Sequence, residues 1–286
     1  MNHDSDIPWQ EIDPLLDRAL REDLGDIGDL TTDCTIPEDL QGRGELIVRE
    51  NGIVAGLFIV GRLFEKIDER LSVDFQASDG SEVSPGDVLS VVEGTVSSIL
   101  KAERTALNFI QRLSGIATLT HRFVSAVDGT GVMILDTRKT TPQFRWLEKY
   151  AVRQGGGQNH RFGLFDMVLI KDNHIDACGG ITPAVERCIA KLKEKGYDVK
   201  IEVECRTLDD VREASRLPVH RIMLDNMDTE TMRRAVEIVR RRMEVEASGN
   251  VSLENVRKIA ENGVDLISVG ALTHSYRSLD ISLLIR

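Results

Sequence analysis

The feature that most constrains this chain is a series of short apolar runs in its second half. Each run is followed by polar residues and then by a segment of helical pattern. The runs are Val132–Leu135, Met167–Ile170, Val199–Val203, Ile222–Leu224, Met243–Val245 and Leu266–Val269. Strands that are apolar throughout are typical of parallel sheets, which are buried on both faces. Successive β-α units of this kind predict a closed or nearly closed (β/α) barrel, with one further strand that is harder to place.

Roughly the first hundred residues have a different pattern, which predicts a separate domain. The expected elements are a helix at Asp13–Asp23, a loop at Gly25–Thr32, strands at Gly44–Val48 and Gly52–Ala55, a helix at Phe58–Ile67, strands at Val73–Ala77 and Val88–Val92, and a helix at Ser97–Ser114. Asn51-Gly52 between two apolar runs predicts a β-hairpin. The loop's threonines and aspartates are interpreted as caps or turns rather than as ligand contacts.

These patterns together predict two domains and an overall α/β fold. Residues 1–115 are expected to form an N-terminal α/β sandwich that includes the helix at 97–114. Residues 116–286 are expected to form an incomplete (β/α) barrel, whose last helix returns to the N-terminal domain. The catalytic part of the chain is then the barrel, because enzymes of this architecture carry their chemistry at the carboxyl ends of the strands.

Composition excludes several classes of protein. The chain has 286 residues, 41% of them hydrophobic, and a formal net charge of −11, which favours a folded protein over a disordered one. No apolar run approaches the roughly 20 residues that a membrane-spanning helix needs, and the acidic start lacks the pattern of a signal peptide. The four cysteines form no CxxC pair, so we expect reduced thiols in a cytoplasmic protein.

One stretch, Leu135–His174, is basic within this acidic chain. It holds seven lysines and arginines against four carboxylates. A locally basic site in an acidic protein favours a small anionic ligand. It argues against a nucleic-acid surface, which would need a basic balance over a whole face. No glycine-rich dinucleotide fingerprint follows a strand.

Polar residues follow the predicted strands at the points where the strands end. They are Thr137, Arg138 and Lys139 after the first strand, Lys171 after the second, Glu202 and Glu204 in the third, Asp225 and Asn226 after the fourth, Ser248, Gly249 and Asn250 after the fifth, and Gly270 and Ala271 after the sixth. Since the carboxyl ends of barrel strands share one mouth, we expect these residues to converge there. A set of solvated surface charges is the alternative interpretation, and it does not explain why cations sit where apolar strands stop.

The residue types at this mouth suggest roles. Arg138 and Arg161 offer planar forks suited to carboxylate or phosphate, whereas Lys139 and Lys171 are compact charges suited to pyrophosphate. His160 is expected either to donate a hydrogen bond or to be structural.

The acidic and glycine-rich residues have two possible uses each. Glu204 and Asp225 offer oxygen ligands for Mg2+, or else form salt bridges to Lys139 and Lys171. Ser248-Gly249-Asn250 and Gly270-Ala271 are expected to precede helices and to cradle a phosphate. The run Gly155–Gly157 follows a helical segment and is interpreted as a C-cap and turn.

The motifs at these positions resemble those of one enzyme family. TRKTTP (Thr137–Pro142), RWLEKYAVRQGGGQNHR (Arg145–Arg161), LIKDNH (Leu169–His174), EVEC (Glu202–Cys205), LDN (Leu224–Asn226), EASGN (Glu246–Asn250), ISVGALTH (Ile267–His274) and ERTALNFIQRLSGIAT (Glu103–Thr118) are similar to quinolinate phosphoribosyltransferase, the decarboxylating nicotinate-nucleotide pyrophosphorylase. The resemblance covers nearly the whole chain. Two departures concern loops: Gln143 and Asn250 stand where glycine is common.

The resemblance implies an activity and an assembly. It implies an N-terminal α/β sandwich, an incomplete α/β barrel and a homodimer, in which Arg104 on the partner-facing helix 97–114 enters the neighbouring active site. The implied reaction joins quinolinate and phosphoribosyl pyrophosphate to give nicotinate mononucleotide, pyrophosphate and CO2, with Mg2+ as cofactor. By motif match, Lys139, Lys171, Glu204 and Asp225 are the implied catalytic residues.

Four alternatives share parts of this pattern. A fold relative associated with molybdate transport and transferases that use nicotinate are sibling families. Several cations at one site favour a dicarboxylate over a monocarboxylate. A Schiff-base aldolase with Lys171 as nucleophile also carries a lysine at the end of a barrel strand. A non-catalytic nucleotide-binding regulator is the last alternative, which turnover would exclude.

Overall fold

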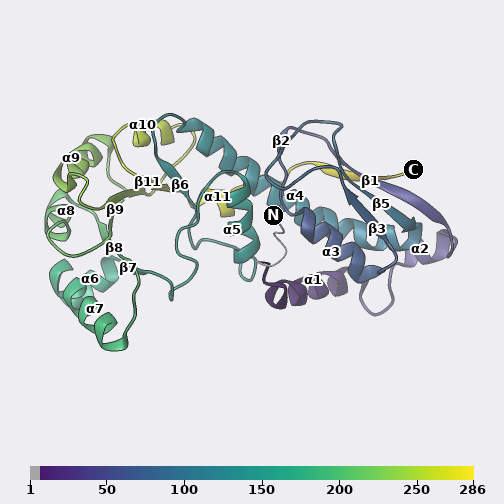
Figure 1. Cartoon of the computed structure of the whole chain (residues 1–286), viewed down its shortest axis with the longest axis horizontal. Coiled ribbons are helices and arrows are strands. Elements are labelled where there is room, and N and C mark those ends of the chain that lie inside the picture. The colour runs from purple at the N-terminus through teal and green to yellow at the C-terminus, as the bar shows by residue number, and fades with distance from the viewer. Residues whose placement is uncertain (1–6) are drawn as a thin grey trace. The chain divides into compact units, whose positions relative to one another are not determined.

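The computed structural model describes residues 7–286, which form two compact units (Figure 1). One unit contains the residues up to Thr118 together with Arg277–Arg286, and the other contains Leu119–Tyr276. The division falls inside helix α4 (Val96–Ala126), close to the boundary predicted at 115/116. None of the helices in the described residues combines the length and apolarity needed to cross a membrane.

The first unit is built on a four-stranded antiparallel sheet. Its order is β12 (Ile281–Ile285), β1 (Gln41–Val48), β5 (Val88–Thr95) and β3 (Ser72–Phe75). Helix α3 (Leu57–Ile67) buries an apolar face of five residues, and its Gly61 lies against Phe75 of β3. Ile99 of α4 packs beside Gly44 of β1. This arrangement of helices on a sheet is the predicted α/β sandwich.

Two expectations for this unit are wrong. The predicted hairpin does not form, because β1 is paired along both edges, by β12 and β5. Strand β2 (Gly52–Ile53) instead pairs with β4 (Glu82–Val83), and the Val54 N–H donates to the Ser81 carbonyl. The end of the chain, expected as a helix, is strand β12. It does belong to the first unit, as the returning segment was expected to do.

Helices of the first unit are longer than predicted. Helix α1 covers Trp9–Leu24, and α2 (Leu30–Thr35) begins inside the predicted loop. Asp29 caps α2 by accepting a hydrogen bond from the Thr32 N–H at 3.0 Å, which confirms the capping interpretation. Helix α4 continues through Gly115, where a Cβ would lie 2.3 Å from the Arg277 carbonyl oxygen. That glycine therefore permits close packing instead of ending the helix.

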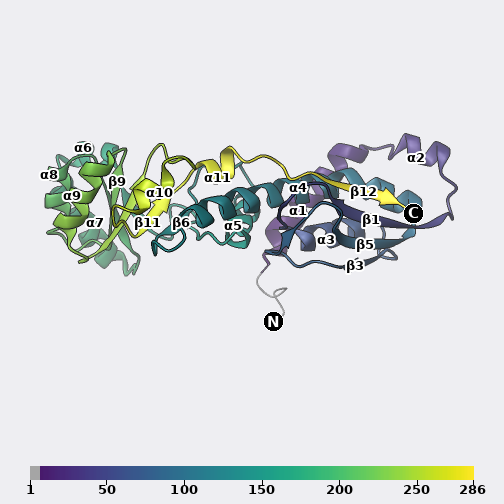
Figure 2. The ribbon, with the colours of Figure 1, turned by 90° about the horizontal axis from the view of Figure 1, so that it is seen from above.

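The second unit is a curved, six-stranded parallel sheet with helices around its outside (Figures 1 and 2). The strands run in the order β6 (Met133–Leu135), β11 (Leu266–Ser268), β10 (Glu244–Ser248), β9 (Arg221–Asp225), β8 (Ile201–Cys205) and β7 (Val168–Ile170). The helices are α5 (Arg145–Gln154), α6 (Asp172–Cys178), α7 (Ile181–Lys195), α8 (Leu208–Ala214), α9 (Thr229–Val239), α10 (Val256–Ala260) and α11 (Ala271–His274). All six predicted strands are confirmed.

The barrel is incomplete between β6 and β7. Within residues 7–286, no strand pairing joins these two strands. The segment beside β6 contributes one parallel bridge, between Leu135 and Gln158. The strand that was hard to place from sequence is thus a single bridge, so the predicted incomplete barrel is confirmed.

Both residues that replace a glycine have left-handed backbones. The φ angle is 67° at Gln143 and 50° at Asn250. This conformation costs an L-residue about 1–2 kcal/mol, and asparagine tolerates it better than glutamine does. A glycine at either position would adopt this backbone without that cost.

This strain leads to a stability prediction for Gln143. We expect Gln143→Gly to raise the free energy of unfolding by about 0.5–1 kcal/mol, because relief of the left-handed backbone exceeds glycine's entropic cost. Urea denaturation of both proteins measures the difference. The control is Gln154→Gly at the end of α5, which should destabilise the protein by about 1 kcal/mol. A lower unfolding midpoint for Gln143→Gly would contradict the strain argument.

Candidate active site at the mouth of the barrel

A cavity of about 740 Å³ lies at the carboxyl ends of the barrel strands. Its volume suits a small-molecule site. Thirteen of the site residues predicted within the barrel line it: Thr137, Arg138, Lys139, His160, Arg161, Lys171, Glu204, Asp225, Ser248, Gly249, Asn250, Gly270 and Ala271. Glu202, which was also expected at the mouth, is fully buried and is not part of the lining. Segments that are far apart in the sequence are therefore brought together as expected.

The cavity also contains residues that sequence reasoning missed. They are Leu169, Met223, Val251, Ser268 and His274. Leu169, Met223 and Ser268 lie on strands β7, β9 and β11, where an inward residue at the mouth cannot be distinguished by pattern from the core below it. Asn226, which was expected at the mouth beside Asp225, does line the cavity.

Two guanidinium groups give the cavity its positive character. Arg138 and Arg161 form no ion pair within residues 7–286, and Nε of Arg138 is buried there without a hydrogen-bond partner. Nη1 of Arg161 donates to the Met167 carbonyl at 3.2 Å. Burial, followed by the charge of Arg138, lowers the pKa of the Arg161 guanidinium. Two neighbouring cations that form no ion pair within residues 7–286 make a site for an anion.

The lysines of the cavity differ in their partners. Nζ of Lys171 lies 2.8 Å from Oε2 of Glu204, so one of the two salt bridges considered from sequence is present. Lys139 forms no ion pair in the described part of the chain, and its Cδ lies close to Gly270. The cavity therefore holds one lysine that is neutralised by a carboxylate and one that is available to a ligand.

A buried ion pair holds together the two segments that carry the arginines. Nζ of Lys149 on α5 bonds to Asp136 at the end of β6, and both side chains are almost fully buried. Asp136 also accepts a hydrogen bond from the His160 N–H at 2.9 Å. Glu148 on α5 accepts one from the Thr141 N–H at 3.1 Å. Helix α5 thereby fixes the loop that follows β6 and the segment around His160.

The glycine-rich loops are shaped by backbone contacts. Gly249 has a φ of +98°, and a Cβ there would lie 2.2 Å from Oδ1 of Asn226. Asn250 donates to the same oxygen at 3.0 Å. The expectation that helices begin directly after these loops is only partly met. Helix α10 begins later, at Val256, and α11 has four residues.

The triple glycine caps a helix, as predicted. Gly155 is the C-cap of α5, and its N–H donates to the Ala151 carbonyl at 3.1 Å. Gly156 has a φ of +85°, and a Cβ on Gly157 would lie 2.7 Å from Cγ2 of Thr120. These glycines therefore serve a turn and close packing and lie outside the cavity lining.

The His160 ring lines the cavity, and both nitrogens lie close to protein groups, although Nε2 forms no hydrogen bond of good geometry within residues 7–286. Nε2 lies 3.1 Å from Glu202 and 3.4 Å from Glu246, and Nδ1 accepts a hydrogen bond from the Arg161 N–H at 2.7 Å. Burial opposes a charge on the ring, but the two carboxylates outweigh it and raise the pKa of His160 to about 9. A second ring proton would displace the Arg161 N–H, so the geometry is that of the Nε2–H tautomer.

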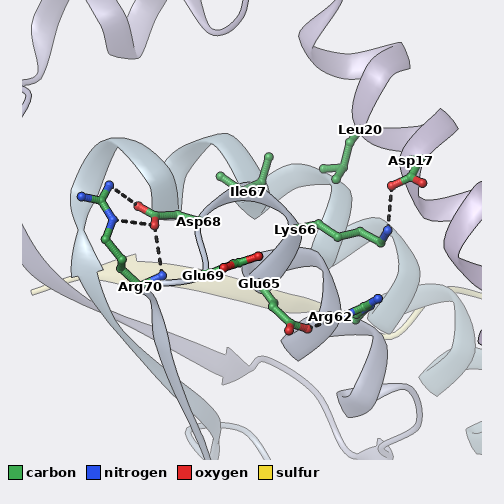
Figure 3. A pocket seen from close by; sticks show the side chains of 9 residues that line it. All are labelled: Asp17, Leu20, Arg62, Glu65, Lys66, Ile67, Asp68, Glu69 and Arg70. Atoms are coloured by element: carbon green, nitrogen blue, oxygen red, sulfur yellow. Dashed lines mark hydrogen bonds and ion pairs between the residues drawn. The ribbon is translucent and has the colours of Figure 1, made fainter.

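A second depression, of about 800 Å³, lies in the first unit and has a different character (Figure 3). Its cations are ion-paired: Arg62 with Asp13 and Glu65, Lys66 with Asp13 and Asp17, and Arg70 with Asp68. Figure 3 shows three of these pairs with their side chains turned toward one another: Arg62 with Glu65, Lys66 with Asp17, and Arg70 with Asp68. Because the charges neutralise each other, this surface offers little to a charged ligand, and the barrel mouth is the better candidate.

Arg104, the predicted contribution from a partner subunit, lies exposed on α4 in the first unit. Its side chain is not part of the cavity lining. The role of Arg104 across an interface therefore stays a prediction.

Comparison with known proteins gives consistent matches over both units. The model of the quinolinate phosphoribosyl transferase C-terminal domain matches residues 116–284, and that of its N-terminal domain matches 29–114. A chloroplastic nicotinate-nucleotide pyrophosphorylase [carboxylating] of Arabidopsis thaliana is 46% identical over 96% of this chain and 83% of its own length.

Solved structures agree with these matches. Nicotinate-nucleotide pyrophosphorylase of Ehrlichia chaffeensis has a TM-score of 0.91 and 41% identity, over 98% of this chain and 99% of its own. NadC of Streptococcus pyogenes has a TM-score of 0.92 and 38% identity, with the same coverage of both chains. The similarity thus extends over both units.

Proposed function

This chain belongs to the quinolinate phosphoribosyltransferase family, and from that premise we propose how the residues of its barrel cavity divide the work of the reaction. The enzyme transfers a phosphoribosyl group from phosphoribosyl pyrophosphate to quinolinate. Loss of CO2 gives nicotinate mononucleotide, and pyrophosphate is released. The reaction is a pentosyl transfer, classed with the glycosyltransferases, and serves NAD biosynthesis.

The proposal rests on one observation: the guanidinium groups of Arg138 and Arg161 line the same cavity, and neither forms an ion pair within residues 7–286. Quinolinate has two adjacent carboxylates, and removing such a dianion from water requires several cations. Arg138 and Arg161 supply two planar forks, and Arg104 of a second copy supplies a third cation in our proposal. A monocarboxylate such as nicotinate would leave this positive charge uncompensated.

Charge development at the sugar explains the remaining polar residues. Pyrophosphate leaves from C1 of the ribose as positive charge grows on the ring, so cations must face the leaving group and carboxylates must face the sugar. Lys139 and Lys171 suit the first task, and Glu204 and Asp225 suit the second. The pyridine nitrogen then attacks C1. As CO2 departs, the electrons of the C–C bond stay on the ring carbon, where the neighbouring pyridinium nitrogen stabilises them until a proton from water replaces the carboxylate.

The lysine at the end of β7 suits electrostatic support better than covalent catalysis. Nζ of Lys171 lies 2.8 Å from Oε2 of Glu204, which is the geometry of an ion pair. A Schiff-base nucleophile must instead be an uncharged amine. Failure to trap Lys171 with borohydride and a carbonyl compound is the expected result.

We further propose that Mg2+ binds with the substrate at Glu204 and Asp225. The donor set fits this ion: two carboxylates at the ends of β8 and β9 line the cavity, and Mg2+ usually takes one or two carboxylates and completes its shell with water and phosphate oxygens. When bound there, Mg2+ neutralises the charge that develops on the leaving pyrophosphate.

Removal of Mg2+ should therefore slow the reaction. We expect excess EDTA to lower turnover at least tenfold, because leaving-group charge is then balanced by the lysines alone. Product formation is followed before and after Mg2+ is added back, and recovery of the rate is the control. Undiminished turnover in EDTA would remove Mg2+ from the proposal.

The test of the reaction itself is release of CO2. Carboxyl-labelled quinolinate is incubated with phosphoribosyl pyrophosphate and Mg2+, and nicotinate replaces it in a parallel reaction. We expect labelled CO2 and stoichiometric nicotinate mononucleotide from quinolinate, and far slower nucleotide formation from nicotinate. Equal or faster use of nicotinate would favour the sibling activity. A lack of turnover with both acids would favour a nucleotide-binding regulator.

We also propose a homodimer in the cytoplasm. The support for the dimer is the family's matching arginine on an exposed face of α4, and the support for the location is four free thiols. Sedimentation of the purified protein tests the first, and fractionation of the source cells tests the second.

A further inference from the structure

A cluster of charged residues fills the interior of the barrel beneath the cavity. Glu202 on β8 and Glu246 on β10 are fully buried. Arg221 on β9, between them, places Nη1 2.8 Å from Oε2 of Glu246 and 4.0 Å from Oε2 of Glu202. The hydroxyl of Ser268 on β11 donates to Oε1 of Glu246. Four neighbouring strands thus contribute charged or polar groups to one buried cluster, which the reaction described above does not use.

Glu202 is the least satisfied member of this cluster. Neither of its oxygens has a hydrogen bond of good geometry within residues 7–286, although Nε2 of His160 lies 3.1 Å away. Burying a carboxylate with so few partners costs several kcal/mol. A carboxylate retained at such a cost, directly against a ring that lines the active cavity, indicates a role at that ring.

We propose that Glu202 and Glu246 are positioning residues that fix the tautomer and orientation of His160, and through it the main chain of Arg161. This inference rests on the proposed function of the cavity. A histidine's tautomer is set by the partner of its other nitrogen. Two carboxylates beside Nε2 hold the proton there, so Nδ1 stays an acceptor.

Nδ1 of His160 is linked to the substrate site through Arg161. It receives the Arg161 N–H at 2.7 Å, and the guanidinium of the same residue lines the cavity. If the ring proton moved to Nδ1, it would face the Arg161 N–H and push the main chain away. The buried carboxylates therefore act on quinolinate only through the placement of Arg161.

A divalent metal at the same place is a weaker explanation. His160, Glu202 and Glu246 each offer a ligand atom, and these atoms lie within 4.8 Å of one another. However, Glu246 already has a guanidinium nitrogen 2.8 Å from one oxygen and a hydroxyl donor on the other. Arg221 thus occupies the place of the cation and would repel a second one.

The test compares two glutamates that contact the same arginine. Glu202→Gln presents an amide that can donate to Nε2 and so favours the wrong tautomer. Glu244→Gln is the matched control, because Glu244 lies 3.0 Å from Nη2 of Arg221 at the amino end of β10 and is partly exposed. We expect Glu202→Gln to raise the KM for quinolinate by about 10- to 100-fold, the range in which a metal-binding histidine responds to loss of its outer partner. The KM for phosphoribosyl pyrophosphate should change less than about twofold, and Glu244→Gln should resemble the wild type.

A second measurement reads the tautomer directly and does not depend on turnover. In 15N-histidine-labelled protein at a pH above 9, where the His160 ring is neutral, we expect the Nε2–H pattern for His160 in the wild type and in Glu244→Gln, and the Nδ1–H pattern in Glu202→Gln. The same tautomer in all three proteins, or equal increases of both KM values, would overturn the proposal. So would a stoichiometric bound metal that is lost in Glu202→Gln.

A pair of His160 variants tests the proposal if Glu202→Gln does not fold. His160→Asn keeps a side-chain acceptor near the position of Nδ1, whereas His160→Leu has none. We expect His160→Leu to raise the KM for quinolinate more than His160→Asn does, and equal effects would count against placement of Arg161 by the ring. If the wild type itself converts no quinolinate, the proposed function fails, and the tautomer measurement still decides whether the carboxylates control the ring.

Discussion

The Lys171→Ala variant is expected to lose about 100- to 1,000-fold in kcat with quinolinate, Mg2+ and phosphoribosyl pyrophosphate. The reason is that Lys171 stands at the carboxyl end of β7 as a fixed cation, and loss of one preorganised group that stabilises transition-state charge costs this much. The KM for quinolinate should change much less than kcat. An interaction that strengthens only in the transition state appears in kcat, whereas uniform binding appears in KM.

The ion pair with Glu204 adds a second consequence to that substitution. Oε2 of Glu204 lies 2.8 Å from Nζ of Lys171, so the alanine variant leaves this carboxylate without its counter-charge in the cavity. The uncompensated negative charge would repel pyrophosphate and worsen the loss. A double variant, Lys171→Ala with Glu204→Gln, should therefore lose less than the product of the two single losses, because the two groups are coupled.

A lysine at the other end of the neighbouring strand serves as the matched control. Lys200 immediately precedes β8 and forms a long, exposed contact with Glu244 at 3.8 Å. Exposed ion pairs of this kind contribute little, so Lys200→Ala should keep turnover within about twofold of the wild type. A loss below tenfold for Lys171→Ala, or equal losses for both variants, would remove Lys171 from the leaving-group role.

The barrel could be predicted because its strands are buried on both faces. Runs such as Met167–Ile170 and Ile222–Leu224 have no polar face, and a parallel sheet covered by helices is the common structure that permits this. The carboxyl ends of parallel strands share one edge, so the polar residues after each run had to meet. Arg138, Lys171 and Asp225 could therefore be assigned to one cavity without any knowledge of contacts.

The errors in the first unit arose where long-range pairing overrides a local signal. Asn51-Gly52 is a good hairpin sequence, but both edges of β1 are occupied, one by β5 and the other by β12 from the far end of the chain. The helix predicted at Ser97–Ser114 continues through Gly115, and this glycine marks the place where the chain near Arg277 passes closely. Neither partner can be identified from the residues around the signal itself.

The residues that line the cavity could be predicted from the sequence, but the contacts between them could not. Charge and position indicated His160 and Glu204, yet the pattern did not show which acid faces which base. Glu202 and Glu204 share one face of a strand, but Glu204 reaches Lys171 in the cavity, whereas Glu202 meets His160 below it. A difference of one strand layer decides this, and the sequence carries no signal for depth within the barrel.

Mixing two inactive variants tests whether Arg104 of one subunit enters the active site of the other. Arg104→Ala and Arg138→Ala should each abolish turnover, because each removes a cation that faces the substrate dianion. Arg138 lines the cavity of its own subunit, and Arg104 is proposed to enter the cavity of the other. In a mixed dimer, the subunit that carries Arg104→Ala then has its own Arg138 and receives an intact Arg104 from its partner.

The expected recovery follows from the symmetry of the dimer. Random exchange of equal amounts gives about half mixed dimers, each with one complete site and one doubly defective site, so about a quarter of the wild-type activity should return. Measured turnover after unfolding and refolding the two variants together gives this value. Recovery near zero, while the refolded wild type regains its activity, would mean that Arg104 acts within its own subunit or not at all.

The double variant Arg104→Ala/Arg138→Ala provides the opposite readout. When it is mixed with the wild type, a shared site predicts that both sites of the mixed dimer are dead. The wild-type subunit receives a defective Arg104, and the variant subunit lacks Arg138. Activity should then fall below the amount contributed by the added wild type, to about half of it in an equal mixture. If each subunit used its own Arg104, the wild-type subunits would keep their full activity. A shared site therefore requires both results: loss of activity in this mixture and recovery of activity when the two single variants are mixed.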